Sequence, residues 1–255
     1  MTLRLNIFDT VQRRIRKNKF LPVDTNLSKH WSSTDTKELY QKNLLIQPSD
    51  WYYRNNTVTY TLNSDGYRTR EFKDIDWANS IVIFGCSHIF GIGLDDKDTI
   101  PTRLEQILNT PVINMGAAGA SMMFNLHNSM ILRDGYPIPK AVIVFWPGYN
   151  RIVEYHKYTT QFHGVWNMAP NSLPNAWFKN DSHAIANAMF MSKAVKLLWQ
   201  EKCPYYETTW DDNTQSVLNC DLLKPIHNDY ARDMLHSGIA SAIYNAQTIA
   251  TKLKL

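Results

Sequence analysis

The chain has 255 residues, of which 44% are hydrophobic and 20% are charged, and its formal net charge is +4. This composition is that of a globular protein and excludes an intrinsically disordered chain. The small positive charge gives no argument for a nucleic-acid-binding protein. A chain of this length buries roughly three quarters of the surface that it exposes when unfolded, so its fold requires neither a disulfide nor a metal ion.

The N-terminal stretch from Leu3 to Leu21 is basic and partly amphipathic, and it lacks the apolar core of a signal peptide. We interpret it as a solvated helix face, with contact to a membrane surface or nucleic acid as the alternative. No apolar run approaches the roughly 20 residues of a transmembrane helix. We therefore expect a soluble, cytoplasmic protein with no membrane span, and we leave association with a virion or a cell surface open.

The first 75 residues differ in character from the rest and are interpreted as an extension of a helix and short β elements packed on the main domain. Within them, TVTYTLNSDGYRTREF alternates polar and apolar residues and contains Asp65-Gly66, which predicts a small hairpin or a strand-turn unit. Residues 76–255 are expected to form the main domain. An aromatic-rich insertion lies near 151–183.

The main domain alternates predicted strands and helices from Ile81 onward. IVIFG, PVINMG and AVIVFWPG are short runs typical of buried parallel strands. Helices are expected over 98–108, where Pro101 suits the first turn, and over 121–132, where Ser121 is a candidate cap. A helix over 184–199, a strand in CPYYETTW and a closing helix over 239–253 follow. This pattern predicts a three-layer α/β/α, flavodoxin-like fold with a central parallel sheet.

Four short blocks lie where the carboxyl ends of these strands meet, which is where doubly wound sheets bind ligands. They are GCSHIFG, NMGAAGAS and GYN after the three strands, and DMLH before the last helix. In this order they resemble the Ser, Gly, Asn and His blocks of the SGNH, or GDSL-like, hydrolase family of esterases and lipases. The resemblance covers roughly 81–253 and leaves the first 75 residues outside it.

The resemblance implies a serine esterase mechanism. Ser87 would be the nucleophile, His236 its general base, and Asp233 the partner that orients the imidazole. The family's oxyanion hole would map to the backbone N–H groups of Ser87 and Gly119 and to the side-chain amide of Asn150. These roles agree with the chemistry of the side chains, since a serine hydroxyl needs a neighbouring base to become a nucleophile.

Cys86 departs from the family's pattern, which usually has Asp immediately before the nucleophile. We interpret it as a small buried hydrophobe, with a thiol nucleophile as the alternative. The three cysteines lack CxxC spacing and predict reduced thiols, although a bridge between Cys203 and Cys220 stays open. His227 and Asp229 lack metal-ligand spacing relative to His236, and neither a metal nor another cofactor is expected.

Three further residues are candidates for binding substrate: His88, Trp146 and Tyr149. For His88 the competing interpretation is a packed histidine, and for the two aromatic residues it is packing of the insertion. We expect a carboxylic-ester hydrolase for a small acyl group, such as acetyl on a saccharide. The alternatives are an inactive protein of this fold that recognises a glycan, and an acyltransferase. No motif encodes an oligomeric state.

Overall fold

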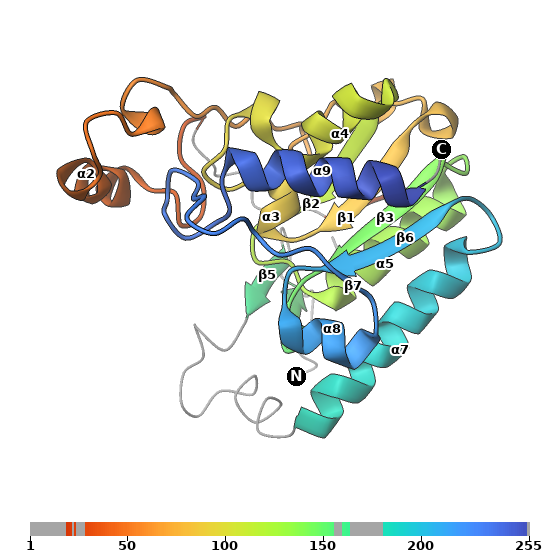
Figure 1. The fold of residues 1–255 in the computed structure, drawn as a ribbon. Helices are drawn as coiled ribbons and strands as arrows, with labels where there is room; N and C mark the ends of the chain where they lie inside the picture. Colours follow the sequence, from red (N-terminus) through yellow and green to blue (C-terminus); the bar gives the residue numbers. More distant parts are fainter. Residues whose placement is uncertain (1–18, 22, 24–28, 156–159, 164–180, 254–255) are drawn as a thin grey trace, which may run out of the picture.

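The computed structural model describes residues 19–21, 23, 29–155, 160–163 and 181–253 (Figure 1). The helix expected over Leu3 to Leu21 therefore lies outside the described residues, apart from its last three positions, which form no helix. Among the described helices, none is long and apolar enough to cross a membrane.

A parallel sheet of five strands, in the order β2-β1-β3-β6-β7, forms the centre of the protein. β2 lies on one side of β1 and β3 on the other, so successive strands are added to opposite sides of β1. This reversal of strand order creates a switch point at the carboxyl end of β1. The bounds of the strands are β1 Ile81–Gly85, β2 Val112–Gly116, β3 Ala141–Trp146, β6 Tyr205–Thr209 and β7 Asp221–Leu222. The first three strands are fully buried, as their unbroken apolar sequences predict.

Helices cover both faces of the sheet and confirm the three-layer α/β/α prediction (Figure 1). Ile81 and Ile83 pack with α4 and α9, whereas Val82 and Phe84 pack on the opposite face with α5 and α7. The alternation follows from the two-residue period of a strand. The helices are α2 Lys37–Ile46, α3 Ser87–Phe90, α4 Ile100–Leu108, α5 Met122–Gly135, α7 Asp181–Trp199, α8 Asp212–Leu218 and α9 Ile239–Leu253; the short 3₁₀ turns are η2 Tyr52–Arg54, η3 Phe72–Asp74, η4 Trp77–Asn79 and η5 Asp96–Asp98.

The helix starts follow from local capping. Ser121 caps α5, and its hydroxyl accepts from the N–H of Phe124 over 3.3 Å, as predicted. Thr99 caps α4 in the same way, and Pro101 lies in the first turn, where its missing N–H costs nothing. The predicted start at residue 98 is two residues early, because η5 occupies the chain up to Asp98.

The hairpin expected over 57–72 is wrong, although its central turn is present. The backbone N–H of Thr59 donates to the Asp95 carboxylate over 3.1 Å, and that of Tyr60 donates to the carbonyl of Lys29 over 2.8 Å. Partners from other parts of the chain thus replace a neighbouring strand. The alternating sequence forms an extended segment and no strand.

The region 151–183, predicted to be an insertion, contains an antiparallel ribbon of β4 Ile152–Tyr155 and β5 Thr160–His163. Its residues 156–159 and 164–180 lie outside the described part of the chain. Its last three residues belong to α7, which begins at Asp181, three positions before the predicted start.

Candidate active site

Ser87 lies at the carboxyl end of β1, where the chain turns sharply into α3. Cys86 is the helix cap, and the carbonyl of Ser87 accepts from the N–H of Gly91 over 2.8 Å, which closes the short helix. Gly91 has a φ of 82°, a conformation that favours glycine. A Cβ at Gly85 would overlap Ile89, so the turn requires glycine there as well. This geometry places Ser87 at the switch point of the sheet.

Asp233 and His236 lie in a tight loop between β7 and α9. The N–H of Ala231 donates to the carbonyl of His236 over 2.9 Å, and Met234 adopts a left-handed φ of 58°. Oδ1 of Asp233 accepts from the N–H groups of Leu235 and His236, both over 3.1 Å. The loop therefore orients the carboxylate through its own backbone.

The structure brings Ser87, His236 and Asp233 into one line of hydrogen bonds. His236 Nε2 lies 2.9 Å from Ser87 Oγ, and His236 Nδ1 lies 2.7 Å from Oδ2 of Asp233. Burial of Asp233 opposes its ionisation, but the hydrogen bond and positive charge of His236 and the hydrogen bonds from Thr34 and the N–H of Leu235 outweigh it. Together they hold the pKa of Asp233 below its ordinary value. An ionised Asp233 in this position would stabilise a proton on Nδ1 of His236 and leave Nε2 able to accept one from Ser87.

Ser87 and His236 open onto a cavity of about 360 Å³. His88, Arg151 and Trp210 line it. Most of the other lining residues belong to the stretch that leads into α9; they are Pro225, Ile226, His227, Asn228, Asp229, Tyr230, Leu235 and Ser237. Several of its apolar side chains are exposed to solvent, which gives the cavity an apolar rim; these are Ile226, Tyr230 and Leu235.

His88 lines this cavity, and its role in binding substrate stays a prediction. Its Nδ1 is 3.1 Å from Ser237 Oγ, and its ring lies 4.9 Å from the ring of Trp210. Burial, together with the positive charges of protonated His236 and of Arg151, lowers the pKa of His88 to about 3. His88 is therefore a neutral imidazole at the pH where His236 would act as a base.

The depressed pKa of His88 makes the protein less stable as the pH falls. The unfolded chain binds a proton at this residue below about pH 6.5, whereas the folded protein binds it only near pH 3. Stability is thus lost progressively below pH 6.5, and between pH 7 and 5 the loss from His88 is at most about 2 kcal/mol. We expect the free energy of unfolding of His88→Gln, measured in urea, to fall by less than that of the wild type over this interval. An equal fall in both proteins would contradict the assignment.

The residues predicted for the oxyanion hole follow neighbouring strands. Gly119 lies in the turn after β2 with a φ of 76°, and Asn150 lies just after β3. Asn150 and Tyr149 line a second cavity, of about 380 Å³. Arg151 lines both this cavity and that of Ser87. Neither Tyr149 nor Asn150 is among the described residues that line the cavity of Ser87.

Two residues of the sequence analysis lie in the core. Trp146 is fully buried, and its Nε1 donates to Glu207 over 3.1 Å, so the structure does not place it in the cavity as a substrate-binding residue. Its position at the end of a strand buried on both faces explains the difference. Cys86 is also fully buried in the apolar core, which agrees with its interpretation as a small hydrophobe.

The structure adds contacts that were not predicted. The Thr34 hydroxyl donates to Oδ2 of Asp233 over 2.6 Å from a position 199 residues earlier, and no local pattern signals such a contact. Arg151 also lines the cavity of Ser87, and its position directly after the GYN block was a usable signal. Among the described residues, no group of three His, Cys, Asp or Glu side chains could hold a metal ion.

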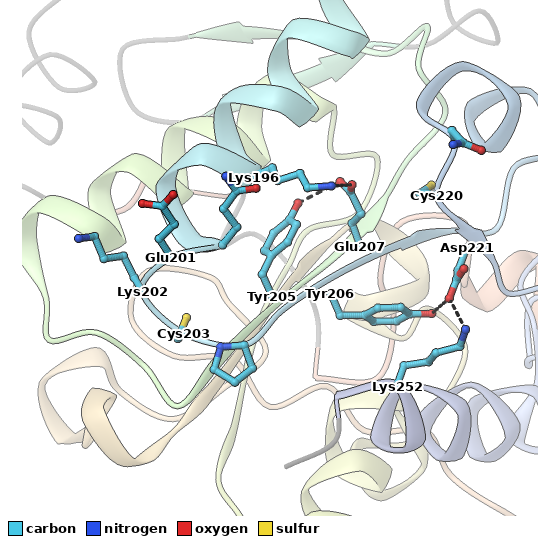
Figure 2. Close-up of a pocket in the computed structure, with 13 residues that line it drawn as sticks. Lys196, Glu201, Lys202, Cys203, Tyr205, Tyr206, Glu207, Cys220, Asp221 and Lys252 are labelled. Carbon is cyan, nitrogen blue, oxygen red and sulfur yellow. Dashed lines mark hydrogen bonds and ion pairs between the residues drawn. The ribbon is translucent and has the colours of Figure 1, made fainter.

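A larger open hollow of about 700 Å³ lies beside β6, and Figure 2 shows the residues around it. Two ion pairs lie in its lining: Lys252 is 2.9 Å from Asp221, and Lys196 is 3.8 Å from Glu207. Cys203 and Cys220 are free thiols here, so the bridge left open by the sequence is not formed. Burial raises the pKa of Cys203 to about 11 and, with the nearby Glu207, that of Cys220 to about 12, so both stay protonated at neutral pH.

No family model matches the chain, and no curated protein matches its sequence. An acetyl xylan esterase from the rumen bacterium Butyrivibrio proteoclasticus is similar in structure, with 10% identity and a TM-score of 0.47 over 71% of this chain and 64% of that chain. A member of the lipolytic protein G-D-S-L family from Veillonella parvula has 11% identity and a TM-score of 0.40 over 68% and 98%. The SGNH-hydrolase family esterase AlinE4 has 17% identity and a TM-score of 0.38 over 71% and 97%. The solved structures to which the chain is similar thus include SGNH, or GDSL, hydrolases, the family that its four sequence blocks resemble.

Proposed function

We propose that the protein is a serine hydrolase of carboxylic esters. The observation that carries the proposal is the continuous line of hydrogen bonds from Asp233 through His236 to Ser87, which ends at a cavity. A serine, a histidine and a buried carboxylate in this order form the arrangement that activates a hydroxyl for attack on a carbonyl.

The reaction follows from these three side chains. His236 Nε2 takes the hydroxyl proton as Ser87 Oγ attacks the ester carbonyl, and the tetrahedral intermediate collapses when the imidazolium returns that proton to the departing alcohol. An acyl group then remains on Ser87. A water molecule, deprotonated by His236, attacks this acyl-enzyme and releases the carboxylic acid and the free serine. Asp233 stabilises the imidazolium in both halves of the reaction.

The oxyanion hole in this proposal consists of the N–H groups of Ser87 and Gly119 and the side-chain amide of Asn150. Support comes from topology: the three residues follow β1, β2 and β3, which are adjacent in the sheet and end at the same edge. Donors at this edge would stabilise the negative charge on the former carbonyl oxygen.

The substrate in this proposal is an ester of a small acyl group, and an acetylated saccharide is our first candidate. A cavity of about 360 Å³ is at the small end of ligand sites. Trp210 and Tyr230 supply aromatic surface beside Ser87, on which a sugar ring could stack. The exposed apolar rim would contact the acyl or alcohol part.

Hydrolysis of p-nitrophenyl acetate, butyrate and palmitate tests the proposal. We expect turnover of the two short esters and little of palmitate, and we expect a fluorophosphonate to label Ser87, located by mass spectrometry of the peptides. Labelling of protein that has been unfolded in urea controls for nonspecific reaction. Failure of both turnover and labelling would favour a glycan-binding protein without activity, and clean hydrolysis of palmitate alone would overturn the small-acyl assignment.

A hydrolase and an acyltransferase differ in what discharges the acyl-enzyme. We expect the released acetate to account for all p-nitrophenol formed when xylose or another acceptor sugar is added at millimolar concentration. An acetylated sugar among the products would instead identify a transferase.

A further inference from the structure

The N-terminal segment contributes a side chain to the environment of the Asp233 carboxylate. The Thr34 hydroxyl donates to Oδ2 of Asp233 over 2.6 Å, and the same oxygen is 2.7 Å from Nδ1 of His236. Oδ1 is occupied by the N–H groups of Leu235 and His236. Of the donors that the described residues supply to this carboxylate, Thr34 alone comes from outside the loop of Asp233 and His236.

Thr34 is held in place by a tight turn. Ser32 and Asp35 pair through both of their backbone groups, with N···O distances of 3.0 Å and 2.9 Å. Ser33 adopts a left-handed φ of 53°, which allows the chain to reverse within two residues. Thr34 therefore lies at the tip of a turn whose backbone is closed on itself.

A buried ion pair fastens this turn to the loop of Asp233. Arg232 Nε and Nη2 lie 3.0 Å and 2.8 Å from the two carboxylate oxygens of Asp35, and the side chains are only 4% and 1% exposed. The ring of Trp31 covers the guanidinium, with its centre 4.2 Å from Cζ. Because Thr34 precedes Asp35 and Asp233 follows Arg232, this ion pair brings Thr34 beside Asp233.

The same network reaches the loop of the nucleophile. The Tyr60 hydroxyl donates to Asp35 over 2.5 Å and accepts from the N–H of Gly93 over 2.7 Å. The carbonyl of Gly93 accepts from the N–H of Arg232 over 3.1 Å. Gly93 comes shortly after α3, whose first residue is Ser87. The turn of Thr34 is thus connected to both halves of the candidate active site.

We infer that Thr34 is a positioning residue for Asp233: its hydroxyl fixes Oδ2 toward His236, and the Asp35–Arg232 pair keeps the hydroxyl there. The inference rests on the proposed function, because it assigns a role within the same line of hydrogen bonds. The turn at 32–35 is then a part of the active site, although it lies outside the four family-like blocks.

The loss of this hydroxyl has a defined electrostatic consequence. A hydrogen bond to a carboxylate withdraws negative charge from it, so its removal makes Asp233 a stronger attractor of the imidazole proton. His236 would then become protonated at a higher pH, and Oδ2 would lose one of the two groups that fix its direction. Thr34 does not line the cavity of Ser87, so substrate binding should not change.

The test compares Thr34→Val, Thr34→Ser and Thr57→Val. Val keeps the shape of Thr and removes only the hydroxyl, Ser restores the hydroxyl, and Thr57 is an exposed threonine of the same segment. For Thr34→Val we expect kcat for p-nitrophenyl acetate to fall about three- to tenfold with KM within about twofold. We also expect the acid limb of kcat/KM and the midpoint of the His236 imidazole titration, followed by NMR, to move up by a few tenths of a pH unit. Thr34→Ser and Thr57→Val should match the wild type.

The titration separates this inference from the proposed function, since it needs no substrate. A His236→Asn spectrum identifies the resonance, and thermal unfolding shows that each variant is folded. A wild type without esterase activity would count against the proposed function only. An unchanged midpoint in Thr34→Val, or an equal shift in Thr57→Val, would overturn the inference whether or not the wild type is active.

Discussion

Replacing Ser87 with Ala is expected to lower kcat for p-nitrophenyl acetate by about 10⁵- to 10⁶-fold. The Ser87 hydroxyl is the nucleophile in the proposed mechanism, so the remaining rate would come from binding and from polarisation of the carbonyl. KM should change little, because the cavity loses one oxygen and its walls stay in place. A pre-steady-state burst of p-nitrophenol, measured with substrate in excess over enzyme, would show the loss of the acyl-enzyme directly.

Cys86→Ala is the matched control, since it removes a nucleophilic atom from the adjacent position. The thiol is fully buried among core side chains, whereas Ser87 lines the cavity and lies 2.9 Å from His236 Nε2. We expect Cys86→Ala to keep kcat within a few-fold of the wild type and to lose about 1 kcal/mol of stability from the small void. Activity that disappears with Cys86→Ala and survives Ser87→Ala would make the thiol the nucleophile.

The central sheet was predictable because its strands are buried on both faces. IVIFG in β1 and AVIVFW in β3 are continuous apolar runs, which few other structures tolerate. The closing helix over 239–253 has the bounds that its sequence predicts, since its apolar residues repeat with the helical period. In these elements, local sequence and tertiary burial impose the same structure.

The N-terminal region was less predictable because its backbone partners are distant. The alternating residues near Tyr60 satisfy the pattern of a strand, yet their N–H groups bond to Lys29, Asp95 and Asp96. A two-residue period indicates an extended chain and does not indicate what lies beside it. The extended conformation was therefore predictable, and the missing hairpin was not.

In the candidate site, too, residues with a local sequence pattern were predictable and residues placed by distant contacts were not. Ser87, Asp233 and His236 were chosen from short blocks at strand ends, and the structure places their side chains within hydrogen-bonding distance. Trp146 was misplaced because its sequence neighbours do not show that the side chain turns into the core. No sequence pattern marks Thr34 as part of the site. Its hydroxyl bonds to Asp233 because an ion pair between distant segments of the chain brings the two residues together.

Asp233→Asn is expected to lower kcat by about 10⁴-fold while the protein stays folded. In the wild type, Oδ1 accepts from two backbone N–H groups, so the amide oxygen of the variant should take that place. The amide nitrogen then replaces Oδ2 and faces His236 Nδ1. Because this nitrogen is a donor, Nδ1 must accept, and the ring proton moves to Nε2.

A proton on Nε2 points at Ser87 Oγ and prevents His236 from acting as its base. The ¹⁵N chemical shifts of the His236 ring report the tautomer, and we expect the two nitrogens to exchange character between the wild type and Asp233→Asn. Asp229→Asn removes the same charge from a residue that lines the same cavity, so it is the control for charge alone. It should retain the wild-type tautomer and lose no more than a few-fold in kcat. Equal losses in the two variants would show that the negative charge of the cavity, and not the tautomer of His236, controls the reaction.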